Sequence, residues 1–125
     1  MTLKIFAIAG LFSLLLLLQA QTPKTVTLEG YIIDNACAGA LSKKDTAGES
    51  IKQHKTSCAL MTSCVTSGYA VYTADAKLYK FDKAGNESAE ALLKDTATKA
   101  GVAVTVEGTI DGDTIKVTKL TEKTE

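Results

Sequence analysis

The sequence has no arginine and no tryptophan, and its 125 residues include only one histidine and one proline. Its 14 basic residues are all lysine and are balanced by 14 acidic residues, so the formal net charge is zero. Proteins that bind nucleic acid concentrate Lys and Arg for phosphate contacts, which argues against that class. A single histidine also excludes a three-histidine zinc hydrolase and a two-histidine blue-copper centre.

The N-terminal segment has the layout of a secretory signal peptide. Lys4 is followed by an uncharged apolar run from Ile5 to Leu18, and a small residue, Ala20, precedes a plausible cleavage point. A membrane-spanning helix needs about 20 apolar residues, and this run is shorter. We therefore expect residues 1–20 to be removed as a signal peptide. The mature protein is then secreted or periplasmic, without stable membrane insertion after signal cleavage.

The rest of the chain predicts a short tether at residues 21–24 and a single domain at 25–122. Alternating Val, Ile, Tyr and Thr residues and turn residues indicate strands. Apolar residues at three- and four-residue steps indicate helices. The predicted strands are 25–34, 69–73, 77–81, 102–110 and 113–120. The predicted helices are 50–67, which starts with a Ser50–Gln53 capping box, and 87–100, while 35–49 is predicted as a long loop.

The closing hairpin is the clearest local pattern. Asp111-Gly112 is a favoured two-residue turn, and a turn there pairs Val106 with Val117 and Gly108 with Ile115. Five short strands joined largely by tight turns favour an antiparallel sheet that curls to protect its edges. The predicted fold is therefore α+β, mainly β with one or two helices: a small five-stranded OB-like antiparallel barrel with an inserted helix.

Three cysteines in an oxidising compartment favour either one disulfide or a metal site. In a continuous helix over 50–67, the rise from Cys58 to Cys64 is about 9 Å. A disulfide requires Cα atoms within about 7 Å, so the predicted bridge joins Cys37 to Cys58 or to Cys64. That bridge would fasten the long loop to the helix.

A transition-metal site is the competing interpretation. His54 and Cys58 are four residues apart and share one face of the predicted helix, as two ligands of a tetrahedral site would. Cys37 and Cys64 complete a three-cysteine, one-histidine set that suits zinc, or copper in its reduced state. Asp34, beside the cysteine loop, is a further ligand or a hydrogen-bond partner of His54.

The same spacing allows thiol chemistry at Cys58 with His54 as its base. The alternative is a purely structural role, in which both residues pack on the buried face of the helix. No CxxC motif supports thioredoxin-like exchange, and we expect no enzymatic activity.

The motifs GYIIDNACA (30–38), HKTSC (54–58) and GVAVTVEGTIDGDTIKV (101–117) carry a resemblance. They resemble small secreted bacterial proteins of unassigned function that pair a DxxC segment with a His/Cys helix and end in a similar hairpin. The hairpin is also similar to that of periplasmic bacterial OB-fold proteins, which implies the barrel but no particular ligand. The resemblance implies a polar cluster made of Asp34, Cys37, His54, Cys58 and Cys64.

Together these observations predict a secreted or periplasmic, non-enzymatic binding module. Its Cys/His cluster serves as a structural disulfide or a transition-metal site, and its partner is a protein or small ligand of the cell envelope. The alternative is a thiol-dependent redox or metal-handling protein that uses Cys58 and His54.

Overall fold

The computed structural model describes residues 24–124, so the predicted signal peptide and most of the predicted tether lie outside the described residues. No helix within that range is long and apolar enough to cross a membrane. The first half contains β1 (Thr25–Asp34), α1 (Asn35–Leu41), α2 (Ala47–Lys52), α3 (Thr56–Ala59) and α4 (Thr62–Ser67). The second half contains β2 (Tyr69–Thr73), β3 (Leu78–Phe81), α5 (Lys83–Asp95), β4 (Ala103–Asp111) and β5 (Thr114–Glu122).

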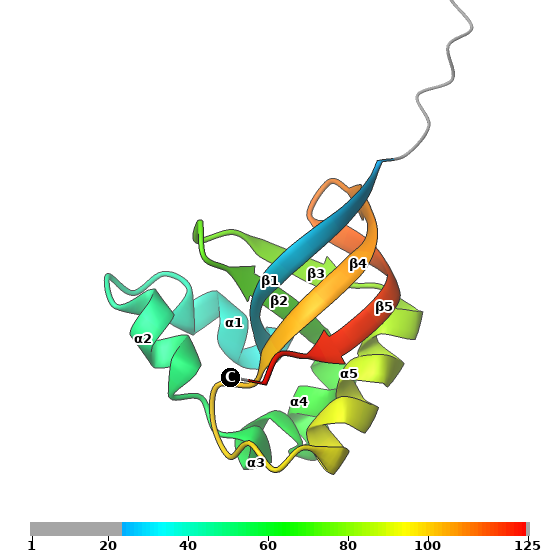
Figure 1. Ribbon diagram of the computed structural model, residues 1–125. Coiled ribbons are helices and arrows are strands. Elements are labelled where there is room, and N and C mark those ends of the chain that lie inside the picture. The colour runs from blue at the N-terminus through cyan, green and yellow to red at the C-terminus, as the bar shows by residue number, and fades with distance from the viewer. Residues whose placement is uncertain (1–23, 125) are drawn as a thin grey trace, which may run out of the picture.

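The five strands form a mixed sheet in the order β1-β2-β3-β5-β4, and the pairing of β4 with β1 closes it into a ring (Figure 1). The α+β class is confirmed. The prediction of a purely antiparallel sheet is wrong, because β3 and β5 run parallel through Lys80↔Thr114 and Phe81↔Ile115. The reason is that α5 separates β3 from the β4–β5 hairpin, which frees β5 to join β3 in the parallel sense.

Strand β1 belongs to two pairings and bends between them. Its residues from Thr25 to Tyr31 pair with β4, and those from Gly30 to Asp34 pair with β2. A Cβ at Gly30 would lie 2.2 Å from the Tyr72 carbonyl oxygen, so only glycine permits this close approach. The bend carries Asp34 to the end of the sheet where the short helices gather.

Two hydrophobic cores lie on opposite sides of the sheet. The first fills the ring and is covered by α5 through Ala89 and Leu93; its strand residues include Ile32, Val71, Phe81, Val104, Val106 and Ile115. The second packs α1 and α2 onto the outer face of β1 and β2, and consists of Ile33, Ala38, Ala47, Ile51, Ala70 and Tyr72. Figure 1 shows α1 beside β1 and β2, α2 next to α1, and α5 beside β5.

The helical region differs most from the prediction. The expected loop at 35–49 contains α1 and the start of α2, and the expected helix at 50–67 is three short helices. Lys55 has an extended backbone and forms a bridge with Ala100, which ends the first piece. Met61 is also extended and separates α3 from α4. The Ser50–Gln53 capping box is wrong because α2 already begins at Ala47.

The second predicted helix, at 87–100, corresponds to α5 at Lys83–Asp95. It begins four residues earlier and ends five residues earlier than predicted. Asp82 caps its N-terminus by accepting a hydrogen bond from Gly85 N–H at 3.0 Å. Thr96 has an extended backbone, and the helix ends there.

The hairpin exists, but its turn lies one residue later than predicted. Asp111 pairs with Thr114, so Gly112 and Asp113 form the turn, and Gly112 has a φ of 63°. Val117 pairs with Gly108 instead of Val106, and an irregularity between Glu107 and Gly108 shifts the later pairs further. Between the turn and Gly108 the slip is two residues, which preserves the face of each side chain, and Ile115 is still buried. Val106, beyond the irregularity, is buried as well.

Candidate metal centre

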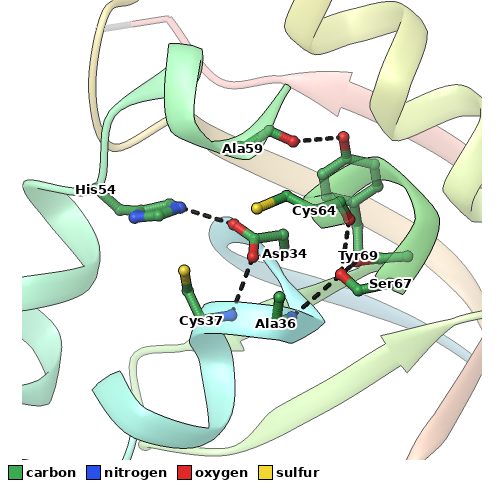
Figure 2. Close-up of polar contacts among 9 residues, drawn as sticks. Asp34, Ala36, Cys37, His54, Ala59, Cys64, Ser67 and Tyr69 are labelled. Atoms are coloured by element: carbon green, nitrogen blue, oxygen red, sulfur yellow. Dashed lines mark hydrogen bonds and ion pairs between the residues drawn. The ribbon is translucent and has the colours of Figure 1, made fainter. Parts of the chain in front are cut away.

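Asp34 is the last residue of β1 and also the N-cap of α1. Its Oδ2 accepts a hydrogen bond from Cys37 N–H at 2.9 Å, which fixes the first turn of α1 against the strand end. An Asp three residues before the donor is the usual arrangement at a helix N-terminus. The D-N-A-C segment therefore holds the Cys37 side chain on the same side as the carboxylate that caps its helix (Figure 2).

The Asp34 carboxylate is fully buried, and its other oxygen is also satisfied. Oδ1 accepts a hydrogen bond from His54 Nε2 at 2.7 Å. Burial raises the pKa of Asp34, but hydrogen bonds from His54 and Cys37 N–H and the charge of His54 outweigh it, so the pKa lies below its usual value. The site therefore contains a buried carboxylate that stays ionised.

Cys64 lies on α4, beside Asp34 and Cys37, and hydrogen bonds hold α4 against α1. Asn35 Nδ2 donates to the Ser67 carbonyl oxygen at 2.9 Å, and Ala36 N–H donates to Ser67 Oγ at 3.1 Å. The backbone adds a hydrogen bond from Asn35 N–H to the Gly68 carbonyl oxygen at 2.9 Å. These contacts between segments about thirty residues apart keep Cys64 beside Asp34 and Cys37.

The donor atoms of Asp34, Cys37 and Cys64 lie within 4.8 Å of one another. Figure 2 shows both sulfur atoms directed toward the side of Asp34 that faces His54. Ligand atoms around a tetrahedral zinc ion are about 3.3 to 3.8 Å apart, given metal–ligand bonds of 2.0–2.3 Å. Small side-chain movements are therefore enough for one carboxylate oxygen and two sulfurs to contact one ion.

The electrostatics of the site keep both thiols protonated in the absence of a cation. Burial raises the pKa of Cys37 to about 11, and the negative charge of Asp34 contributes in the same direction. Burial and then Asp34 also raise the pKa of Cys64. A reactive cysteine needs a lowered pKa, so neither thiol is set up as a nucleophile. A bound metal ion would reverse this balance, because Cys37 and Cys64 would bind it as thiolates in place of their protons.

The structure unites three of the five predicted site residues in one donor group: Asp34, Cys37 and Cys64. His54 lies outside that group and joins it through its hydrogen bond to Asp34. Cys58, half-buried on α3, is not part of the group. The prediction that His54 and Cys58 share one helical face is wrong, because α2 ends at Lys52 and α3 begins at Thr56.

All three cysteines are free thiols, so the predicted disulfide of Cys37 with Cys58 or Cys64 is not formed in this structure. Cys58 and Cys64 lie on separate helices, α3 and α4, so the rise along one continuous helix does not apply to this pair. Sequence reasoning missed Asn35 and Ser67, which join α1 to α4. Neither residue belongs to a periodic pattern, and their role depends on contacts between distant segments.

A separate hollow of about 430 Å³ lies on the outside of the ring, between α2 and the strands. It is lined by Glu29, Gly30, Tyr31, Gly48, Lys52, Tyr72, Thr73, Ala74, Ala103 and Lys123. Its charged groups already have partners, since Lys123 pairs with Glu29 at 3.1 Å and Lys52 lies 5.8 Å from the centre of the Tyr31 ring.

No protein-family model, curated protein or solved structure matches this chain.

Proposed function

We propose that this protein binds a transition-metal ion through Asp34, Cys37 and Cys64. The observation that carries the proposal is the convergence of one buried carboxylate and two thiols, from three different elements, within 4.8 Å. Two sulfur donors select borderline or soft ions such as zinc or copper over magnesium and calcium. The ligands come from β1, α1 and α4, so a bound ion joins the sheet to two helices.

His54 acts as the positioning residue for the carboxylate. Its Nε2 is 2.7 Å from Asp34 Oδ1, and its side chain is 11% exposed, so it lies between the buried carboxylate and the solvent. Pairs of this kind between His and a carboxylate orient metal ligands. In this arrangement His54 restricts the rotation of the Asp34 carboxylate.

Metal binding supplies stability as well as a function. The mature domain is small, and domains of that size gain much from a metal or a disulfide. Because the unfolded chain lacks a preformed site, the free energy of binding adds to the free energy of folding.

We further propose that the site belongs to a secreted or periplasmic, non-enzymatic binding module with an OB-like barrel. The signal-like N-terminus supports the location. The closed order of five strands, with α5 following β3, supports the OB-like assignment. The partner of such a module is a protein or small ligand of the cell envelope.

The test is metal stoichiometry by native mass spectrometry on reduced protein titrated with Zn(II) and, without oxygen, with Cu(I). We expect one ion per chain in the natural protein and none in Cys37→Ser or Cys64→Ser. Cys58→Ser is the matched control, since it removes a thiol that lies outside the donor group. Full metal content in Cys64→Ser would refute the proposal.

The second candidate is a Cys37–Cys64 disulfide at the same place. It is favoured by the same proximity of the two sulfur atoms, and a bridge there would fasten α1 to α4. Protein exported to an oxidising compartment would then show one alkylatable thiol, Cys58, and a mass two hydrogens lower than the reduced chain. Three alkylatable thiols together with bound metal would rule this candidate out.

A further inference from the structure

The hollow of about 430 Å³ on the outside of the ring has an aromatic floor. Tyr31 lies in the middle of this floor, since it pairs with Tyr72 of β2 on one side and with Ala103 of β4 on the other. Side chains of directly paired residues lie on the same face of a sheet. Tyr31 also packs against the hydrophobic cluster that contains Tyr72. Packing therefore holds both rings in place, and the small side chain of Ala103 leaves room beside them.

Helix α2 forms a wall of the hollow through Gly48 and Lys52. These residues are four apart, so they share one face of the helix. A Cβ at Gly48 would meet no atom within 4 Å, which means that open space reaches the helix backbone at this point. The volume of the hollow lies within the range of about 300–1,000 Å³ that is typical of small-molecule sites.

The charges around the hollow do not balance, because two lysines and one glutamate line it. Lys123 Nζ lies 3.1 Å from Glu29 Oε2, so these two charges offset each other. Lys52 Nζ lies 5.8 Å from the centre of the Tyr31 ring, which is uncharged, and Lys52 pairs with no carboxylate among residues 24–124. One positive charge therefore remains next to the aromatic floor.

We propose that this hollow binds a small aromatic carboxylate, with its ring against Tyr31 and Tyr72 and its carboxylate at Lys52. Tyrosine rings offer a large contact surface to another flat ring. A single positive charge without an acidic partner matches a monoanion better than a phosphate dianion. A mostly apolar lining with a few polar groups that orient the ligand is the usual composition of such sites. The site is separate from the metal centre, because none of the three metal donors lines the hollow.

The test is a titration of isotope-labelled, reduced, metal-free mature protein with cinnamate, followed by the NMR shifts of the backbone amides. Cinnamyl alcohol, which has the same ring without the charge, is the matched ligand. We expect saturable binding of cinnamate, with the largest shifts at residues that line the hollow, such as Gly30, Gly48 and Ala103. Since Lys52 is exposed, we expect the alcohol to bind about fivefold more weakly, as for one exposed ion pair.

Two variants separate the shape of the hollow from its charge. Gly48→Leu places a side chain in the open space and should weaken the binding of both ligands by about tenfold or more. Gly39→Leu is its matched control, because a Cβ at Gly39 also meets nothing within 4 Å but this residue of α1 does not line the hollow. Lys52→Met keeps the apolar stem and removes the charge, so it should weaken cinnamate about fivefold and leave the alcohol unchanged.

The proposal is overturned if millimolar cinnamate gives no saturable shifts, or if Gly48→Leu binds both ligands as well as Gly39→Leu does. It is also overturned if the acid and the alcohol bind equally, or if Lys52→Met does not weaken cinnamate, since the ligand class depends on that charge. Each of these results leaves the proposed metal function intact, because metal stoichiometry is measured separately and its donors lie outside the hollow.

Discussion

The buried carboxylate of Asp34 leads to the most discriminating prediction, because it has two structural roles that two substitutions separate. Its Oδ2 caps α1 through Cys37 N–H, and its Oδ1 accepts from His54 Nε2. Asp34→Ala removes both contacts. Asp34→Asn keeps an oxygen for the cap, at which Asn is as effective as Asp, and loses only the charged partner of His54.

The magnitudes follow from these contacts. Loss of an N-cap costs about 1 kcal/mol. Loss of a hydrogen bond to a charged group costs about 1.5–3 kcal/mol, and more when a buried partner is left unsatisfied. We therefore expect Asp34→Ala to lower the free energy of unfolding by about 3 kcal/mol and Asp34→Asn by about 2 kcal/mol.

The assay is urea unfolding of reduced, metal-free protein followed by circular dichroism, with Asp45→Asn as the control at an exposed aspartate. Equal losses in Asp34→Ala and Asp34→Asn would refute the separate role of the cap. Losses below about 0.5 kcal/mol in both, as at an ordinary surface position, would refute the whole account of the site.

The pH dependence provides an independent check on the same residue. The pKa of Asp34 in the folded protein lies below its ordinary value of 3.8. Its contribution to stability is therefore present above that ordinary value and is lost as the pH falls through the lower, folded pKa. In Asp34→Asn the acid side of the stability curve should be flatter, and the absence of any change there would contradict the assignment.

Three further predictions concern other residues of the domain. The pKa of Cys37 rises from 9.0 to about 11 in the folded protein, so stability should fall as the pH rises from about 9 through 11. In alkaline urea titrations Cys37→Ser should remove part of that fall and leave the part that comes from Cys64, whose pKa is also raised. Gly101→Ala should lower the free energy of unfolding in urea by at least about 2 kcal/mol, because Gly101 has a φ of 62° and a Cβ there would lie 2.2 Å from the Lys52 carbonyl oxygen. Gly39→Ala is the control, since a Cβ at Gly39 meets nothing within 4 Å and alanine there should not destabilise the protein. Ser67→Ala should cost about 1 kcal/mol and weaken metal binding, measured by competition with a chelator, because it removes the hydrogen bond from Ala36 N–H to Ser67 Oγ, one of the three that hold α4 against α1. Unchanged affinity would show that this hydrogen bond does not position Cys64.

Local signals in the sequence were sufficient for the strands. The predicted strands at 25–34, 69–73 and 77–81 correspond to β1, β2 and β3. The final hairpin was also predictable, since alternation alone places Val102, Val104 and Val106 on one face, and all three are buried. Its turn was misplaced by one residue, because either Asp111-Gly112 or Gly112-Asp113 suits a tight turn and long-range pairing selects between them.

The helices show where periodicity misleads. Ile51, Cys58 and Val65 recur at helical spacing, yet the helix is interrupted at Lys55 and again at Met61, where the backbone is extended. The first break depends on a bridge to Ala100, a residue far away in the sequence. Helices this short are not stable alone, so tertiary contacts determine where each begins and ends.

By itself, the sequence determined the α+β class, the five strands, and the presence of Asp34 and three cysteines among the residues able to bind a metal. The tertiary structure alone decided the parallel pairing of β3 with β5 and the choice of Cys64 over Cys58. The hydrogen bond between His54 and Asp34 is one of the two roles that the sequence predicted for Asp34. The physical reason is the range of the interactions. Alternation, capping and turn preferences act over a few residues, whereas the site is held by contacts between segments 20 to 32 residues apart.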